Sequence, residues 1–444
     1  MTPRRPAVRP APPWHWPQPV TQQLDNGLLI DQYRLPGQRA ISLAMIVDAP
    51  LTAEPPEVEG VADLSLQACD EGTCTHPGPA LTDALEGCGA AVVAAGARLD
   101  GATLAVEAPV TRLQQVMPLL AEMIREPAYA PDDVARLVND RLLGIATGEC
   151  SPPVVARKAF YSSFGQHRLA RPVGGTAETV ARITPEAMHT WHDAAVRPNR
   201  ARLILAGDLP DDTAAWAQAA FGSWGASSIG ELPAAVPPPA PPRCRVLLVH
   251  RSDAAQASLR AGTLTPTRGH QDWAGLQLAN AVVGSMFGSR LNFVLREQHG
   301  LTYGAGSVLS PARETAVFVA HAECNPDSVV LAAQLMLEQL DLNAAPITQI
   351  EARGAVNFLT RATPMRLDTA AAVASQAAEF ALGAVPPDWF DAHMNNVRHT
   401  TAEAAQQAFT LHITPSDLVI AICGNATELE PRLIAAGLPP EVIE

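Results

Sequence analysis

The chain has 444 residues, a formal net charge of −14 and a hydrophobic content of 47%. This length is too great for one hydrophobic core, and the acidic balance argues against a nucleic-acid or anionic-membrane partner. We expect no membrane span and no secretory signal, because no apolar run is long enough for either. The seven cysteines are scattered and odd in number, which is typical of reduced thiols and predicts a cytoplasmic protein.

The first half of the chain mixes strands with helices. Residues 41–47 and 102–108 alternate in polarity as half-buried strands do. Thr184 followed by Pro185 predicts the start of a helix. Another helix is predicted after Thr111, which with Gln114 fits a capping box, and its core-facing stripe comprises Leu113, Val116, Met117, Leu120 and Ile124.

Two similar strands mark a duplication. Residues 202–208, RLILAGD, and residues 417–425, DLVIAICGN, are apolar runs that end in Gly-Asp and Gly-Asn. The strand 41–47 has its counterpart in 257–263 at a comparable distance. A repeated unit of about 200 residues explains these matches economically.

We therefore predict an α+β fold made of two tandem homologous domains, each a mixed or antiparallel sheet with helices packed on one face. The proline-rich stretch 232–242 can be neither helix nor central strand and is the expected linker. The predicted division is an N-terminal extension at 1–23, one domain at 24–231, the linker, and a second domain at 243–444.

The segment 289–304, SRLNFVLREQHGLTYG, reads as an amphipathic helix that stops at Gly300. Arg296 lies in its last turn, and Tyr303 follows just beyond the stop. A fixed cation and a phenol placed in this way can converge on a peptide carbonyl or a developing oxyanion. The alternative is that Arg296 complements the helix dipole and Tyr303 packs as an ordinary half-buried aromatic residue.

Several segments together resemble the pitrilysin-like, or insulinase-type, zinc peptidases. They are 60–73 (GVADLSLQACDEGT), 171–176 (RPVGGT), the run WHDAAVRPNRARLILAGDL and the LREQHGLTYG segment, in the order seen in that family. The resemblance covers nearly the whole chain and is closest to the short two-domain branch that includes mitochondrial processing peptidase. It implies half of a clam-shell chamber that holds peptides in extended form.

The family carries an inverted zinc motif, H-x-x-E-H, with a third glutamate ligand about 76 residues later. Alignment on the flanking glycines places Asp63, Leu66 and Gln67 at the three motif positions, and counting onward places Gly144 at the third ligand. No zinc-competent set remains, so we expect no metal or cofactor in this chain and no peptidase activity from it alone. A lone peptidase that uses unorthodox ligands is the disfavoured alternative.

One other histidine pair could in principle substitute. His189 and His192 lie one turn apart on the helix after Pro185. The resemblance makes that helix a structural one, and we favour a structural role for both residues.

In heterodimeric members of the family, one subunit supplies zinc and the other supplies an arginine and a tyrosine. The resemblance therefore implies that this chain is the non-catalytic, substrate-binding subunit of a heterodimeric zinc endopeptidase. Arg296 and Tyr303 would contact the peptide, and a homologous partner subunit would hold the zinc. Small precursor peptides whose leaders are removed are the substrates suggested by analogy. The alternative is a structural subunit similar to the core proteins of respiratory cytochrome complexes.

Overall fold

The computed structural model describes residues 14–225 and 245–443. Within these ranges the strands form two six-stranded sheets, one from each half of the chain. The first sheet has the order β1-β2-β6-β3-β5-β4 and contains β1 (Val20–Gln23), β2 (Leu29–Arg34), β3 (Ala40–Val47), β4 (Ala91–Arg98), β5 (Gly101–Pro109) and β6 (Ala201–Gly207).

The second sheet repeats this order. It runs β12-β7-β11-β8-β10-β9 and contains β7 (Arg245–His250), β8 (Ala257–Thr265), β9 (Thr302–Pro311), β10 (Ala316–Cys324), β11 (Val419–Gly424) and β12 (Pro440–Ile443). The predicted counterparts β3 and β8, and β6 and β11, occupy equivalent places, which confirms the duplication. The sheets differ at one edge, because β1 pairs antiparallel with β2 whereas β12 pairs parallel with β7.

The helices of the first half are α1 (Val61–Gln67), α2 (Pro79–Gly87), α3 (Leu113–Arg125), α4 (Pro131–Gly148), α5 (Pro152–Ser162), α6 (Ala177–Val180), α7 (Pro185–Ala195) and α8 (Thr213–Phe221). The predicted stripe on α3 is fully buried. Thr184 caps α7 by accepting a hydrogen bond from the backbone N–H of Ala187, as predicted. The predicted cap of α3 is wrong, because a short 3₁₀ turn, Val110–Arg112, precedes the helix and no side chain caps it.

The helices of the second half are α9 (Trp273–Asn280), α10 (Arg290–Asn292), α11 (Val329–Leu340), α12 (Gln349–Arg366), α13 (Ala370–Leu382), α14 (Trp389–His399), α15 (Ala402–His412) and α16 (Ala426–Ala435). The linker predicted at 232–242 lies outside the described residues. No helix in the described ranges is long and apolar enough to cross a membrane.

Each sheet is buried on both faces. In β3, Leu43 and Met45 point into the core formed with the helices of the first half, whereas Ala44 and Ile46 point into a second core on the opposite face. In β11 the alternation is the same: Ile420 packs into one core and Ala421 into another. Such double burial explains why these strands are almost continuously apolar.

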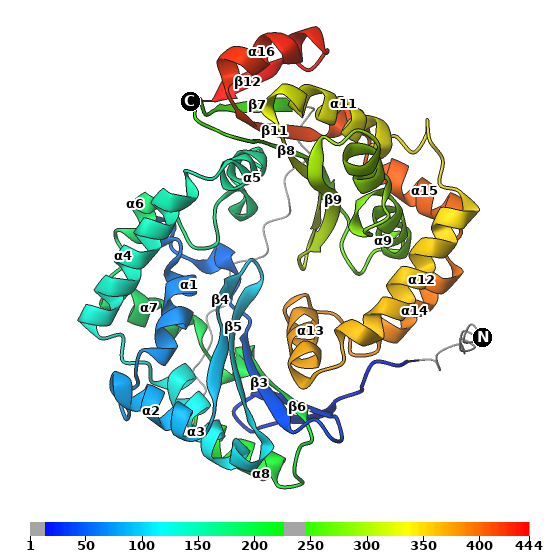
Figure 1. Ribbon diagram of the computed structural model, residues 1–444. Helices are drawn as coiled ribbons and strands as arrows, with labels where there is room; N and C mark the ends of the chain where they lie inside the picture. Colours follow the sequence, from blue (N-terminus) through cyan, green and yellow to red (C-terminus); the bar gives the residue numbers. More distant parts are fainter. Residues whose placement is uncertain (1–13, 226–244, 444) are drawn as a thin grey trace, which may run out of the picture.

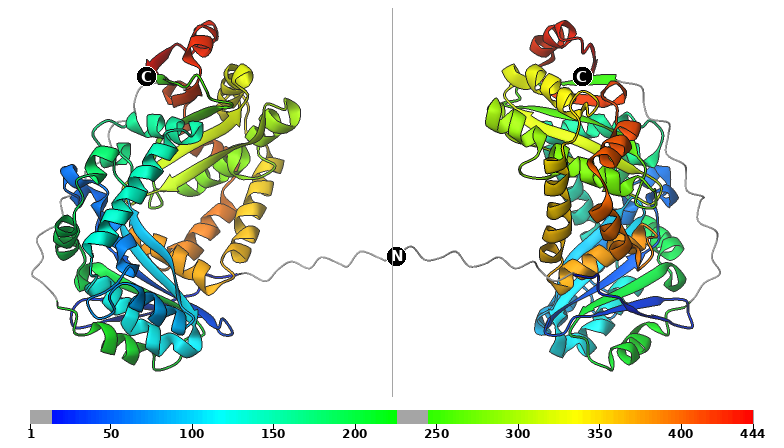
Figure 2. Two further views of the ribbon diagram at one scale, coloured as in Figure 1. Left: turned by 60° about the vertical axis from the view of Figure 1, so that its left-hand side comes forward. Right: turned by 90° about the vertical axis from the view of Figure 1, so that its right-hand side faces the viewer.

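The second face of each sheet is covered by a helix from the other half of the chain. α13 packs against β3 and β6 of the first sheet, and α5 packs against β8 and β11 of the second. Figure 1 shows the orange α13 beside the first sheet and the teal α5 beside the second. In Figure 2 the gold and orange segment α12–α14 runs from the second sheet domain to the first. The two domains therefore exchange helices, and neither sheet is covered by its own half alone.

Candidate functional site

Helix α1 carries the degenerate zinc motif, and a buried ion pair fixes its first turn. Glu54 accepts hydrogen bonds from the backbone N–H groups of Gly60 and Ala62, both at 3.0 Å, and so satisfies free donors at the start of the helix. Arg168 donates to the same carboxylate at 2.9 Å. Burial raises the pKa of Glu54, and the hydrogen bonds and the charge of Arg168 oppose this rise.

Asp63, the first motif position, is bound by a cation from α4. Arg141 Nη2 lies 2.5 Å from Asp63 Oδ2, Gln67 donates to the same oxygen at 3.0 Å, and the backbone N–H of Ala97 on β4 donates to Oδ1 at 2.9 Å. The Asp63 side chain is only 11% exposed. A guanidinium group therefore neutralises the carboxylate, and three donors bind its two oxygens.

Two glycines make room for this cluster. A Cβ at Gly174 would collide with the Arg141 guanidinium, and a Cβ at Gly96 would lie 2.7 Å from Asp63 Oδ1. Gly174 lies in the turn before α6, and Thr176 caps that helix. The absence of side chains at Gly96 and Gly174 lets two backbone segments close over the ion pair.

The other motif positions cannot serve a metal. Leu66 is fully buried in the core of the first domain. Gly144 lies on the exposed face of α4, where an added Cβ would meet no neighbour within 4 Å. The α4 residue that reaches Asp63 is Arg141, less than one helical turn before Gly144. An apolar side chain, an amide and a cation around one carboxylate do not form a zinc site.

A hollow of about 610 Å³ borders this cluster. Its walls are β4, β5 and α13, and most of the lining side chains are small, among them Ala94, Gly96, Ala371, Ser375 and Ala378. β4 is the outermost strand of the first sheet. Its outer edge, where only the Ala97 N–H is bound by Asp63 among the contacts described above, adjoins the hollow and gives an extended chain a place to pair with the sheet.

The predicted helix around Arg296 is less regular than expected. α10 passes into a π-helical turn, Phe293–Gln298, which carries Arg296. Gly300 follows with a left-handed φ of 63°, as predicted for the stop. The chain then enters β9, the outermost strand of the second sheet, with Tyr303 near its start.

Arg296 and Tyr303 are both accessible, but they do not bond to each other. The Arg296 guanidinium lies 5.2 Å from the centre of the Phe287 ring, and its Nε lies 3.4 Å from Glu297 Oε1. Tyr303 is 92% exposed, and its hydroxyl has no hydrogen-bond partner among the described residues. The described residues thus show no contact between the Arg296 and Tyr303 side chains, and Phe287 is a neighbour of Arg296 that the sequence did not reveal.

Asn292 and Arg290 hold this segment in place. The buried Asn292 donates to the carbonyl of Phe287 at 2.7 Å and accepts from the backbone N–H of Ala305 on β9 at 3.4 Å. Arg290 forms a bidentate ion pair with Glu351 at 2.7 and 2.8 Å. The loop, the π-helical turn and the edge strand are thus joined into one unit.

The alternative histidine pair is structural, as predicted. His192 is buried, and its Nε2 lies 2.9 Å from the carbonyl oxygen of Ile124. Burial lowers the pKa of His192. The ring of Tyr129 packs edge-on against both His189 and His192. These contacts place His192 in the core, whereas His189 is exposed and only packs against the Tyr129 ring.

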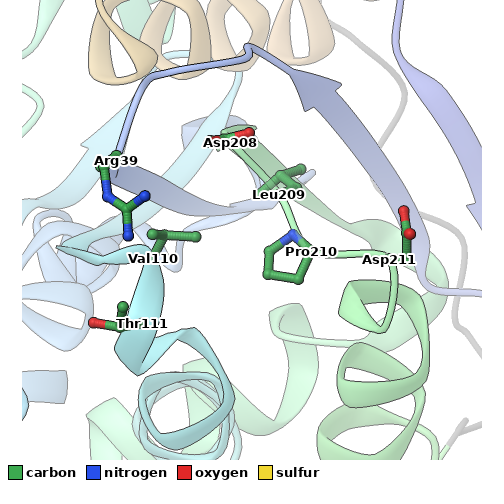
Figure 3. Close-up of a pocket in the computed structure, with 7 residues that line it drawn as sticks. All are labelled: Arg39, Val110, Thr111, Asp208, Leu209, Pro210 and Asp211. Carbon is green, nitrogen blue, oxygen red and sulfur yellow. The ribbon is translucent and has the colours of Figure 1, made fainter.

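A second hollow, of about 380 Å³, lies at the end of β6 in the first sheet. In Figure 3, Arg39 and Asp211 stand on opposite sides of this hollow, and Pro210 and Val110 lie between them. Its charged groups do not converge on a common point, so we assign it no chemistry.

The described residues place one metal-competent set elsewhere. His270, Asp272 and His412 bring ligand atoms within 4.8 Å of one another. The sequence analysis missed this set because His412 is 140 residues away from Asp272 along the chain.

These features define a duplicated two-domain protein with a peptidase-like architecture. Sequence profiles of known families match two stretches of it. One is described as insulinase, peptidase family M16, and covers residues 33–177; the other is described as the peptidase M16 inactive domain and covers residues 182–358. The chain belongs to peptidase family M16, the insulinase or pitrilysin-like family.

Individual relatives agree with this assignment. An uncharacterized zinc protease of Mycobacterium leprae is 26% identical over 336 residues, which are 74% of this chain and 75% of that protein. The peptidase M16 inactive domain from Pseudomonas fluorescens superposes with a TM-score of 0.83 at 23% identity, covering 92% of this chain and 98% of that one. A chain of Complex III2 from Candida albicans gives 0.77 at 16% identity, covering 92% and 97%.

Proposed function

We propose that this chain is the non-catalytic, substrate-binding subunit of a heterodimeric zinc endopeptidase. The observation that carries the proposal is the contrast between its two edge-strand sites. Arg141 neutralises Asp63 beside β4, whereas Tyr303 presents an exposed hydroxyl at the start of β9. A chain that served only as a scaffold would gain nothing from leaving a phenol 92% exposed at this place.

The chemistry of the two residues suits a peptide that is cleaved elsewhere in the complex. The Tyr303 hydroxyl donates a hydrogen bond to the scissile carbonyl oxygen, and this bond strengthens as negative charge develops on that oxygen. Loss of one such donor typically costs about 3 kcal/mol of transition-state stabilisation. Arg296 is a permanent cation that orients the same part of the peptide.

The partner is a homologous subunit with an intact H-x-x-E-H motif, and the zinc belongs to that subunit. Extended peptides pair with the free edge of β4 beside the hollow of about 610 Å³, whose small side chains leave room for those of the substrate. Precursor peptides with removable leaders fit such a chamber. The cytoplasmic location stays a prediction from the cysteine pattern; the six described cysteines are free thiols.

A structural subunit is the second candidate, and the similarity to a chain of Complex III2 favours it. The two candidates differ in what the partner must contain. The peptidase subunit requires a partner that has the zinc motif and lacks its own arginine and tyrosine pair. A scaffold subunit requires no particular zinc motif, arginine or tyrosine in its partner.

Reconstitution with the zinc-bearing homologue encoded nearest to this chain tests the proposal. Each purified subunit is assayed alone and in an equimolar mixture against a pool of fluorogenic peptides. Our proposal predicts cleavage by the mixture and none by either subunit. A stable complex that cleaves nothing, or a partner that is fully active alone, would support the scaffold instead.

A further inference from the structure

A second group of metal-ligating side chains lies in the second domain, away from both edge strands. His270 lies three residues before the start of α9, Asp272 is the residue directly before it, and His412 is the last residue of α15. α9 and α15 pack against each other, and this packing brings the three side chains together. From their geometry we propose that they bind one divalent transition-metal ion of the zinc type, independently of the proposed function.

The distances suit a tetrahedral ion. His412 Nε2 lies 2.8 Å from Asp272 Oδ2, and His270 Nδ1 lies 3.6 Å from the same oxygen. Ligands bound to zinc at 2.0–2.1 Å in tetrahedral geometry are about 3.3 Å apart. These two separations lie on either side of this value, and all three ligand atoms lie within 4.8 Å of one another.

The ligand types select the ion. Two imidazoles and one carboxylate suit zinc, nickel and copper, whereas magnesium and calcium prefer oxygen ligands alone. His270 Nδ1 already accepts a hydrogen bond from the backbone N–H of Asp272, so its lone pair is available in the neutral ring. The ion would take the place of that hydrogen bond and of the contact between His412 and Asp272.

The surroundings leave the fourth position to water. The three side chains are partly exposed, 40% for His270, 21% for Asp272 and 18% for His412. The ion would join the start of α9 to the end of α15, and α9 leads into the loop that carries Phe287. Its expected role is to stiffen this helix pair, and no part of the peptidase chemistry depends on it.

Metal titration of the full, tag-free chain tests the site. Co²⁺ is the probe, because tetrahedral Co²⁺ absorbs visible light, and Zn²⁺ displaces it; Mg²⁺ serves as the ion that should not compete. We expect one ion per chain and a higher thermal-unfolding midpoint in Zn²⁺. His412→Ala and Asp272→Asn should each lower the affinity by at least about tenfold. His399→Ala is the matched control, because His399 also ends a helix but is exposed and bonds only within α14.

The metal titration can support or overturn the proposed site. Stoichiometric binding that is lost in His412→Ala and kept in His399→Ala supports the site. Absence of binding, or binding that His412→Ala leaves unchanged, overturns it. Binding that disappears in Asp63→Asn also overturns it, because the ion would then lie at the degenerate motif.

Discussion

The Arg141 guanidinium lies 2.5 Å from the Asp63 carboxylate, at the place where the family motif would put a zinc ligand. A protein cation thus balances the charge of this buried carboxylate. The substitution keeps the buried carboxylate neutralised and lets Gly96 and Gly174 close around it. A packed ion pair therefore occupies this end of α1.

The Arg141–Asp63 pair should contribute to stability. Arg141→Ala leaves the carboxylate buried without its cation, and we expect a loss of about 2–3 kcal/mol, less than for a fully buried pair because the Arg141 side chain is 24% exposed. Arg182→Ala is the control, since its pair with Glu178 is exposed and should be worth less than about 0.5 kcal/mol. Urea denaturation compares them. Equal midpoints for the two variants would contradict the structural role of Arg141.

Restoring the motif glutamate alone should harm the protein. Leu66→Glu places a carboxylate in a fully buried apolar position, and we expect a loss of about 3–5 kcal/mol. Leu66→Met keeps the volume and polarity and should cost less than about 1.5 kcal/mol. Thermal unfolding of both variants measures the difference. A Leu66→Glu protein as stable as Leu66→Met would mean that this position opens into the hollow.

The exchanged helix α5 should be essential to the second domain. Phe160 is fully buried against the second sheet, so Phe160→Ala should destabilise the protein by about 3–5 kcal/mol. Phe293→Ala is the matched control at a 59% exposed position and should change stability by less than about 0.5 kcal/mol. Unfolding followed by circular dichroism compares the two. A small effect of Phe160→Ala would mean that the second sheet does not depend on α5.

Acid should weaken the Arg290–Glu351 ion pair that holds the segment carrying Arg296. Partial burial raises the pKa of Glu351, but the hydrogen bonds from Arg290 and Thr348 outweigh this effect and bring the pKa to about 2. Because the pKa of Glu351 is lower in the folded chain than in the unfolded chain, its ionised carboxylate stabilises the fold. This stabilisation is complete above the unfolded-state pKa near 4.5 and is lost as the pH falls toward 2.

The measurement is the difference in the free energy of unfolding between the wild-type chain and Glu351→Gln, obtained by urea denaturation at each pH. After allowance for solvent screening we expect a gap of about 1 kcal/mol at pH 6 that closes by about pH 2. A gap that does not change between these pH values would show that Arg290 and Glu351 are not coupled.

Much of the fold follows from local pattern. The apolar strands, the buried stripe of α3 and the cap at Thr184 depend on neighbouring residues, and the sequence analysis predicted them correctly. Thr111 was mispredicted because Pro109 and the 3₁₀ turn after it delay the start of α3. The exchange of α5 and α13 depends on long-range packing, so no local pattern indicates it.

The candidate site was only partly predictable. The loss of zinc ligands follows from residue types, and the stop at Gly300 follows from its conformational freedom. The replacement cation was missed, because counting along the chain leads to Gly144 while the helical geometry of α4 presents Arg141. The contact between Arg296 and Phe287 was missed too, since it depends on how a loop folds back.

The turnover of the reconstituted heterodimer with Tyr303→Phe tests the central proposal most directly. The substitution removes one hydroxyl from an exposed ring and should leave assembly unchanged, as size-exclusion chromatography would verify. We predict a fall in kcat of about 10²–10³, as expected for loss of an oxyanion donor, with little change in KM. A variant complex that cleaves at the wild-type rate would contradict the assignment of Tyr303 to the composite site.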